Sequence, residues 1–312
     1  MKILSLAETR AALPFEALIE ALDAGFRAGG EVPLRHQHLM TNHGAAEDVL
    51  LLMPAWQAEG WGGVKIVNVH PGNAALDLPA IASSYILFDR CTGAHALILD
   101  GGELTARRTA AASALAAKRL ARPDSRHQLI VGAGRVGANL AQAYRAALPI
   151  ETVEVWNRTA ASAEALAAEL RAGGIAAQAV TDLAAAVGRA DVISCATLAR
   201  APLIRGDWLR PGQHIDLIGS FTPEMREADD AVMRRVRIFL DTDHARVESG
   251  DIAQPLASGA IGLADIEGTL DTLCRKNLFP RRSEDEITLF KGVGSGLEDL
   301  AAAILAHDRV AG

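Results

Sequence analysis

The chain has 312 residues, of which 50% are hydrophobic and 22% are charged, and its formal net charge is -7. This composition supports two folded domains with apolar cores and excludes a chain that is largely disordered. The sequence contains neither a basic run nor an uninterrupted apolar stretch of about 18 residues, so we expect no nucleic-acid binding and no membrane span.

The first part of the chain predicts a small α+β domain. Apolar residues recur at helical spacing from Phe15 to Ala28, and Gly29 ends the pattern, so we expect an amphipathic helix there. Short β-type runs follow at 49–53, 64–69, 81–88 and 96–99, and turn-forming residues separate them. They predict an antiparallel sheet. Thr105 is expected to cap a helix that continues to about Ala121.

The second part of the chain alternates strands with helices. We expect strands near 128–131, 152–156, 175–180, 191–195, 213–218 and 236–241, and a final helix at 297–306 that returns to the first domain. Six strands that alternate with helices are typical of a doubly wound parallel sheet. The predicted class is therefore α/β: a Rossmann domain of residues 122–287 and a smaller α+β domain of residues 1–121 with 288–312.

A glycine-rich turn follows the first strand of the Rossmann domain. Gly132 allows the tight turn, Gly134 lets the backbone approach a pyrophosphate, and Gly137 lets a helix pack on the strand. The helix N-terminus adds amide groups and positive potential. We therefore predict a nicotinamide dinucleotide site. The residues expected in its phosphate loop are Gly132, Ala133, Gly134, Arg135, Val136 and Gly137.

The second strand of this domain ends at Asn157, Arg158 and Thr159. NAD enzymes usually carry an acid there that binds the ribose. A guanidinium can bind a 2′-phosphate, which a carboxylate would repel, so we predict that NADP(H) is preferred over NAD(H). A surface arginine unrelated to the cofactor is the alternative. Two later strand ends should also border the cofactor, and their residues are Ala196, Thr197, Leu198, Gly219 and Ser220.

Three cationic side chains of the first domain are candidates for binding a carboxylate: Arg35, Lys65 and Arg108. Lys65 has an alternative interpretation as a solvated edge-strand lysine, and Arg35 as a loop charge. Arg108 is expected in the first turn of its helix, where the helix dipole disfavours a cation. A nearby anion would explain that placement.

Several motifs resemble the ornithine cyclodeaminase and mu-crystallin family, and the resemblance covers essentially the whole chain. They are LTARRTAAASA at 104–114, KIVNVHPGN at 65–73, VWNRT at 155–159, ADVI at 190–193, PGQHI at 211–215, and Phe290-Lys291. The resemblance implies that Arg35, Lys65 and Arg108 bind the carboxylate of an amino or imino acid. It also implies a homodimer formed through the first domain with the C-terminal helix.

One position departs from the pattern of the cyclodeaminases. In those enzymes an aspartate after the fifth strand is thought to engage the distal amine of the substrate, whereas this chain has Phe221 there. This is similar to the imine reductases and alanine dehydrogenases of the family. We therefore expect NAD(P)-dependent reduction of a small imino acid, with Phe221 in the substrate site and Lys65 able to relay a proton. Conversion of ornithine to proline and a cofactor-dependent binding protein are the alternatives.

The remaining candidates give weaker signals. His36, His38 and His43 share one segment, but no acid or cysteine at ligand spacing joins them, so we expect no metal site. His70 either borders the substrate pocket or has a structural role. The three cysteines, Cys91, Cys195 and Cys274, lie far apart in the sequence and form no CxxC pair. Reduced thiols and the lack of a recognised export signal predict a cytoplasmic protein.

Overall fold

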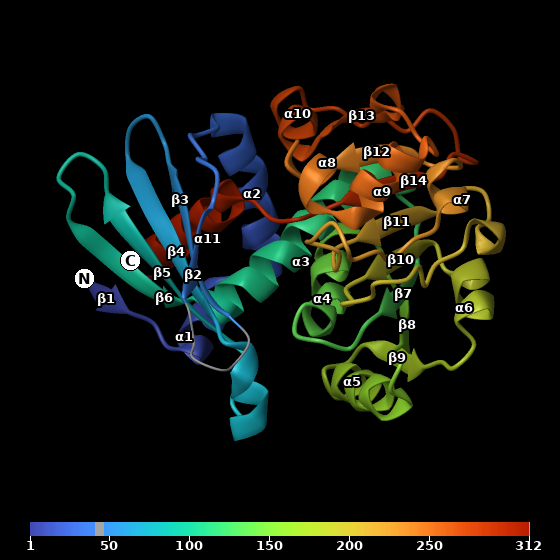
Figure 1. Ribbon diagram of the computed structural model, residues 1–312, viewed down its shortest axis with the longest axis horizontal. Coiled ribbons are helices and arrows are strands. Elements are labelled where there is room, and N and C mark those ends of the chain that lie inside the picture. Colours follow the sequence, from blue (N-terminus) through green and yellow to red (C-terminus); the bar gives the residue numbers. More distant parts are fainter. Residues whose placement is uncertain (41–46, 312) are drawn as a thin grey trace. The chain divides into compact units, whose positions relative to one another are not determined.

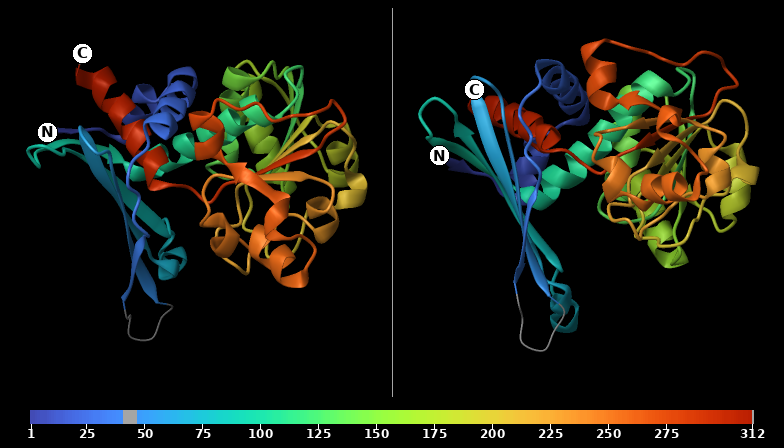
Figure 2. Two further views of the ribbon diagram at one scale, coloured as in Figure 1. Left: turned by 90° about the horizontal axis from the view of Figure 1, so that it is seen from above. Right: turned by 45° about the horizontal axis from the view of Figure 1, so that its top comes forward.

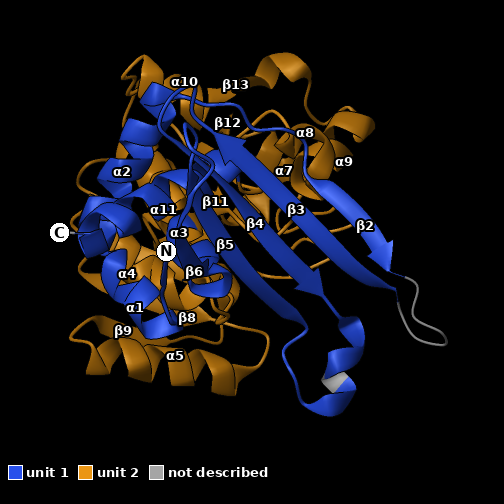
Figure 3. Ribbon diagram, turned by 90° about the vertical axis from the view of Figure 1, so that its left-hand side faces the viewer, with its two compact units in different colours: residues 1–108, 295–312 blue, residues 109–294 orange. Residues whose placement is uncertain are grey.

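The computed structural model describes residues 1–40 and 47–311, apart from the side chain of Ala74, and they form two compact units (Figure 3). Unit 1 comprises residues 1–108 and 295–312, and unit 2 comprises residues 109–294. The border lies inside helix α3 (Gly101–Leu120), earlier than the expected border at residue 121, because α3 is one continuous helix. None of the helices in the described part of the chain has the length and hydropathy needed to cross a membrane.

Unit 1 contains a six-stranded sheet with the strand order β1-β6-β5-β4-β3-β2. Its strands are β1 (Lys2–Ile3), β2 (His36–Met40), β3 (Asp48–Trp56), β4 (Trp61–Val69), β5 (Ile81–Asp89) and β6 (His95–Asp100). Strands β2 to β6 pair antiparallel, and the pairing of β3 to β6 confirms the predicted sheet. Strand β2, which the sequence did not predict, extends this sheet beside β3, and β1 pairs parallel with β6. Strand β1 was not predicted because two residues are too few to show an alternating pattern.

Helices cover one face of this sheet. They are α1 (Leu6–Ala12), α2 (Phe15–Ala28) and α11 (Gly296–Ala311), and a 3-10 helix, η1 (Pro71–Leu76), follows β4. The predicted helices at 15–28 and near 297–306 are confirmed, and α11 packs against α2, β3 and β4 (Figure 2). A Cβ atom on Gly25 would lie 2.7 Å from the Cβ of Ala301, so only a glycine permits this close approach of α2 and α11.

Helix α3 begins one turn earlier than predicted. The Oδ1 atom of Asp100 accepts a hydrogen bond from the backbone N of Glu103 at 2.7 Å, so Asp100 caps the helix and Thr105 lies inside it. The low helix propensity of Gly101 and its neighbouring glycine concealed this start. Arg108 consequently lies in the second turn, where the helix dipole acts only weakly on a side chain. The dipole argument for an anion beside Arg108 is therefore wrong.

Unit 2 contains an eight-stranded parallel sheet with the order β13-β12-β14-β11-β10-β7-β8-β9. Its strands are β7 (His127–Val131), β8 (Thr152–Trp156), β9 (Ala176–Ala179), β10 (Val192–Cys195), β11 (His214–Leu217), β12 (Arg237–Leu240), β13 (Ile266–Thr269) and β14 (Thr288–Lys291). The six predicted strands are confirmed, and β13 and β14 were missed. Residues 288–294, expected in the first domain, belong to unit 2 because β14 lies between β11 and β12 (Figure 1).

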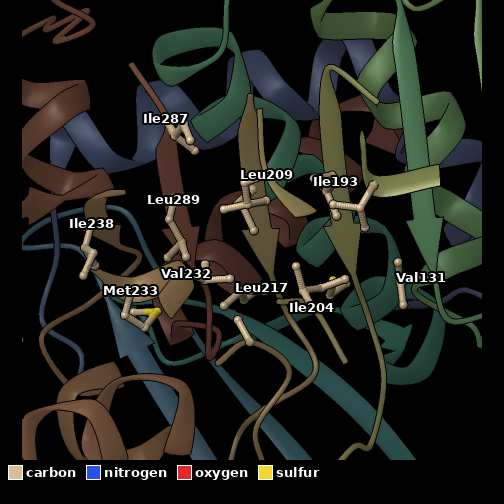
Figure 4. Close-up of a cluster of buried hydrophobic side chains, with 14 of the residues drawn as sticks. Val131, Ile193, Ile204, Leu209, Leu217, Val232, Met233, Ile238, Ile287 and Leu289 are labelled. Atoms are coloured by element: carbon tan, nitrogen blue, oxygen red, sulfur yellow. The ribbon is translucent and has the colours of Figure 1, made fainter. Parts of the chain in front are cut away.

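The crossover connections of unit 2 are mostly helical. They contain α4 (Gly137–Ala147), α5 (Ala160–Ala172), α6 (Leu183–Arg189), α7 (Asp230–Met233), α8 (Ala245–Glu248), α9 (Gly250–Ser258), α10 (Leu270–Arg275), η2 (Gly206–Trp208) and η3 (Leu263–Asp265). Ile193, Leu217, Leu289 and Ile238 come from neighbouring strands and pack in one buried cluster (Figure 4). Because all these strands run parallel, the loops that follow β7, β8, β10 and β11 lie at one edge of the sheet, where doubly wound folds bind ligands.

Candidate functional site

The glycine loop of unit 2 has the geometry that its sequence predicts. Gly132 has a φ of 111°, and a Cβ atom on it would lie 2.5 Å from the carbonyl oxygen of Ala196. A Cβ on Gly137 would lie only 2.0 Å from the carbonyl oxygen of Gly132, whereas a Cβ on Gly134 would meet no atom within 4 Å. Gly132 and Gly137 are therefore required by the fold. Gly134 leaves open space above an exposed stretch of backbone.

This open loop fits a phosphate group. Helix α4 begins at Gly137 directly after the loop, and no side chain caps its first turn. Uncapped amide groups and the helix dipole favour a bound anion at such an N-terminus. Arg135 is exposed in the same loop and adds a positive charge, and Ala133 and Val136 are partly buried. The loop can therefore hold the pyrophosphate of a dinucleotide.

The three residues after β8 have different environments. Asn157 accepts a hydrogen bond from the backbone N of Ala133 at 3.2 Å and donates one to the carbonyl oxygen of Thr159 at 3.1 Å. Asn157 thus fixes the glycine loop, a role that its sequence position did not reveal. Arg158 and Thr159 are exposed, and Arg158 has no ion-pair partner among the described residues. Arg158 is the residue of this segment that is available to a cofactor phosphate.

A buried glutamate joins the two later strand ends. Oε1 of Glu227 accepts hydrogen bonds from the backbone N and the hydroxyl of Thr197, both at 2.7 Å. Its Oε2 accepts one from the backbone N of Gly219 at 2.7 Å. Burial, with a contribution from Asp251, raises the pKa of Glu227 to about 7. Glu227 therefore fixes the loops after β10 and β11, and sequence reasoning missed it.

The other residues of these strand ends differ in exposure. Ser220 is fully buried, and its hydroxyl donates to the carbonyl oxygen of Met225 at 2.5 Å and lies 2.8 Å from the hydroxyl of Ser249. Its side chain therefore serves the interior of unit 2. Leu198 and Phe221 are 74% and 47% exposed. Ala196 is partly buried.

Lys65 and Arg108 come together in the interior of unit 1. Lys65 lies on β4 and Arg108 on α3, and both side chains are buried. Nζ of Lys65 is 2.7 Å from Oδ2 of Asp299, and Nε of Arg108 donates to Oδ1 of the same carboxylate at 2.8 Å. Nη1 of Arg108 donates to Oε2 of Glu298 at 2.7 Å. Four buried charged groups thus form one cluster, with two cations and two carboxylates.

Burial and charge act on this cluster in opposite directions. Burial lowers the pKa of Lys65, the carboxylate of Asp299 raises it in part, and the positive charge of Arg108 lowers it further, so the net shift is downward. Burial alone would lower the pKa of Arg108, but the carboxylates of Asp299 and Glu298 raise it. Arg108 is therefore a permanent cation, whereas Lys65 loses its proton more readily than an exposed lysine does.

Tyr85 lies beside this cluster on the same face of the sheet. Tyr85 is the register partner of Lys65 in the β4–β5 pair, and it is fully buried. Its hydroxyl has no hydrogen-bond partner among the described residues. A Cβ on Gly63 would lie 2.2 Å from that hydroxyl, so Gly63 provides the space for it. Burial raises the pKa of Tyr85 well above its ordinary value, so the phenol stays neutral.

Arg35, the third candidate cation, also belongs to unit 1. It directly precedes β2, and β3 separates β2 from the strand that carries Lys65. His70 forms a contact of 3.1 Å with Asp48, which favours its structural interpretation. No group of three or more metal-binding side chains occurs in residues 1–40 and 47–311, and His43 falls outside these ranges.

The sequence contained an overlooked signal for Asp299, one of the two carboxylates of the cluster. Asp299, Ala302, Ala303 and Ala306 recur at helical spacing and are all fully buried or nearly so. A charged residue at a core position of an amphipathic helix indicates a buried partner. This pattern would have identified Asp299 before the structure was known.

The chain is similar to one protein family over nearly its whole length. Residues 2–312 match the Ornithine cyclodeaminase/mu-crystallin family. A Delta(1)-pyrroline-2-carboxylate reductase of Paracoccus denitrificans is 46% identical over 270 residues, which are 85% of this chain and 84% of the relative. The two proteins therefore align over most of both chains.

Two solved structures are similar to the whole chain. The Delta(1)-pyrroline-2-carboxylate reductase of Thermococcus litoralis in complex with NADH and L-proline has a TM-score of 0.92 at 31% identity, covering 100% of this chain and 98% of that chain. An archaeal alanine dehydrogenase dimer with bound NAD has a TM-score of 0.89 at 27% identity, covering 99% and 95%. The two-domain α/β fold is thus shared with nicotinamide-dependent enzymes of amino and imino acids.

Proposed function

Because the chain belongs to the ornithine cyclodeaminase/mu-crystallin family, we propose that it reduces a cyclic imino acid. It is an NAD(P)-dependent enzyme, like the imine reductases and amino acid dehydrogenases of that family. The substrate carries a carboxylate on the carbon of its C=N bond. The relatives from P. denitrificans and T. litoralis are both named for such a substrate, a pyrroline-2-carboxylate.

The buried pair of Lys65 and Arg108 carries this proposal. Nε and Nη1 of Arg108 are bound by Asp299 and Glu298, while Nη2 has no hydrogen-bond partner among the described residues. A guanidinium that is fixed on two sides by carboxylates and has one free nitrogen can bind the carboxylate of a substrate in a single orientation. We propose that Arg35 contributes to the same carboxylate site.

The chemistry divides between the cofactor and these side chains. When bound, the nicotinamide supplies the hydride for the imine carbon. Arg108 holds the substrate carboxylate and so fixes the position of the neighbouring carbon. Lys65, whose pKa is lowered by burial, donates a proton to the imine nitrogen. The neutral phenol of Tyr85 lies beside Lys65 and adds no competing charge.

The test compares a cyclic imino acid with ornithine. We expect kcat/KM for the five-membered pyrroline-2-carboxylate to exceed that for ornithine by at least about 100-fold. The reason is that Phe221 offers no group for the distal ammonium, and an unpaired ammonium costs several kcal/mol in a closed site. Cofactor oxidation and ammonia release are both measured. Faster release of ammonia from ornithine would establish a cyclodeaminase instead, and cofactor binding without turnover would indicate a binding protein.

The cofactor preference is a separate proposal. We propose that NADP(H) binds more tightly than NAD(H), because Arg158 is exposed at the end of β8 with no ion-pair partner in the described ranges. A charge-assisted bond to a 2′-phosphate corresponds to roughly 5- to 150-fold in affinity. Fluorescence titration of both reduced cofactors should show this preference, and Arg158→Ala should remove it. Equal affinities of the wild type for the two cofactors would refute the proposed preference. Tighter binding of NADH, which is the cofactor in the T. litoralis structure, would also refute it.

We propose that the protein is a homodimer that pairs through the unit 1 sheet. The face opposite Lys65 is apolar and only partly buried, and Leu52, Val64, Ile66, Ile86 and Ile98 lie on it. Such an apolar face usually marks a protein interface. Light scattering should give twice the chain mass of 32.9 kDa, and Ile86→Glu should lower it. A wild-type mass of one chain at micromolar concentration would contradict the proposal.

A further inference from the structure

Asp299 contacts both cations of the buried cluster. Its Oδ2 lies 2.7 Å from Nζ of Lys65, and its Oδ1 accepts from Nε of Arg108 at 2.8 Å. The side chain of Asp299 is fully buried. A single rigid carboxylate therefore sets the distance between the ammonium and the guanidinium.

Helix α11 fixes this carboxylate in place. The hydroxyl of Ser295 accepts a hydrogen bond from the backbone N of Leu297 at 3.2 Å, so the start of the helix is capped. Asp299 lies in the first turn, where the helix dipole favours an acidic side chain. The small residue Gly296 lets this turn approach β3, since a Cβ on it would lie 3.1 Å from the carbonyl oxygen of Pro54.

Stability alone does not account for this cluster. Buried ion pairs give little or no net stability compared with apolar residues of the same volume, because the charges must be desolvated. The register partner of Lys65 on β3 is the apolar residue Met53. An apolar pair would serve the core equally well, so the retained charges indicate a functional role.

We propose that Asp299 is the positioning residue of the site: it holds Lys65 protonated and aligns it with Arg108 for the nitrogen and the carboxylate of one imino acid. This inference rests on the proposed function. Asp299 acts through the two cations and does not itself touch the substrate. Glu298 contacts Arg108 at 2.7 Å and contributes less than Asp299 to the pKa of Lys65.

The groups that face Lys65 determine the direction of the expected pH effect. They are Asp299 and Glu298 on α11, Arg108 on α3 and the neutral Tyr85 on β5. Burial lowers the pKa of Lys65, and Asp299 is the main group that opposes this shift. Loss of the charge on Asp299 therefore lowers the pKa of Lys65 further. Activity that needs protonated Lys65 should then be lost at a lower pH than in the wild type.

The experiment compares Asp299→Asn with Glu298→Gln in the imine reduction assay. Asparagine has the shape of aspartate but no charge. We expect kcat/KM of Asp299→Asn to fall by about 10- to 100-fold, as for a lost charge-assisted hydrogen bond. We also expect the alkaline limb of its profile of kcat/KM against pH to move to lower pH. Glu298→Gln should move that limb in the same direction but less than Asp299→Asn, because the charge of Glu298 contributes less than that of Asp299 to the pKa of Lys65. Fluorescence titration of the reduced cofactor, which binds to unit 2, should give wild-type affinity for both variants.

A second readout needs no substrate. Competitive labelling with acetic anhydride, followed by mass spectrometry of the peptide that contains Lys65, reports the pH at which this amine loses its proton. The transition should occur at lower pH in Asp299→Asn than in the wild type. If the wild type reduces no imino acid, the proposed function fails; if it does, and neither the limb nor the labelling transition moves in Asp299→Asn, the inference on Asp299 fails.

The conservative variant covers the case in which Asp299→Asn does not fold. Asp299→Glu keeps the charge but extends the side chain by one methylene, so it should keep the alkaline limb and lose kcat/KM through misplaced cations. A folded Asp299→Glu with wild-type kcat/KM would overturn the positioning role.

Discussion

Arg108→Met is expected to lower kcat/KM for the cyclic imino acid by about 1000-fold, which corresponds to about 4 kcal/mol of lost transition-state binding. Arg108 has Asp299 and Glu298 on two of its nitrogens, and we propose that the third holds the substrate carboxylate. Methionine has a similar length but no charge and no donor. The measurement is steady-state oxidation of the reduced cofactor.

The same change also leaves two buried carboxylates without their guanidinium. Breaking a buried pair in this way costs about 3–5 kcal/mol of unfolding free energy. A loss of activity could then reflect unfolding, so the double variant Arg108→Met with Glu298→Gln is needed. It removes one buried charge and should recover part of the stability in a urea titration, whereas activity should stay low. Recovery of activity together with stability would contradict a role in substrate binding.

The neighbouring Arg107 provides a matched control. It is also buried on α3, but its Nε donates to the carbonyl oxygen of Leu13 at 2.8 Å and its guanidinium lies 4.0 Å from the centre of the Phe15 ring. Arg107→Met should therefore destabilise unit 1 and leave kcat/KM within about threefold of the wild type. Equal losses of activity in both variants would refute the specific role of Arg108.

Two glycines of the same loop are expected to respond in opposite ways to alanine. Gly137→Ala would place a Cβ 2.0 Å from the carbonyl oxygen of Gly132, so we expect a loss of about 3 kcal/mol in the free energy of unfolding. Gly134→Ala meets no atom within 4 Å and should be as stable as the wild type or slightly more stable. Urea unfolding measures both.

Cofactor affinity should then separate from stability. In Gly134→Ala the methyl group occupies the open space where we propose that the pyrophosphate approaches the backbone, so we expect cofactor affinity to fall by about 10- to 100-fold in a folded protein. Wild-type affinity in Gly134→Ala would show that the loop does not hold the pyrophosphate. Wild-type stability in Gly137→Ala would show that the packing of α4 on the loop has been misjudged.

The sequence predicted the regular parts of both units because local patterns determine them. Strand and helix periodicity identified α2 and the six strands of the Rossmann sheet, and the glycine spacing identified the turn from β7 to α4. It missed β14, whose position between β11 and β12 depends on a return of the chain that no local pattern encodes. The sequence prediction also placed the start of α3 too late, because two glycines at the start of this helix are more typical of a loop.

What the sequence determined by itself is the kind of protein: its family motifs, its fold class, its dinucleotide loop and its two candidate cations Lys65 and Arg108. Only the tertiary structure decided their chemical state. Asp299 lies more than 190 residues after Arg108 in the chain, yet it contacts both cations because α11 packs on the sheet of unit 1. Burial and the charges of neighbours set the pKa of a group, and both depend on residues distant in sequence.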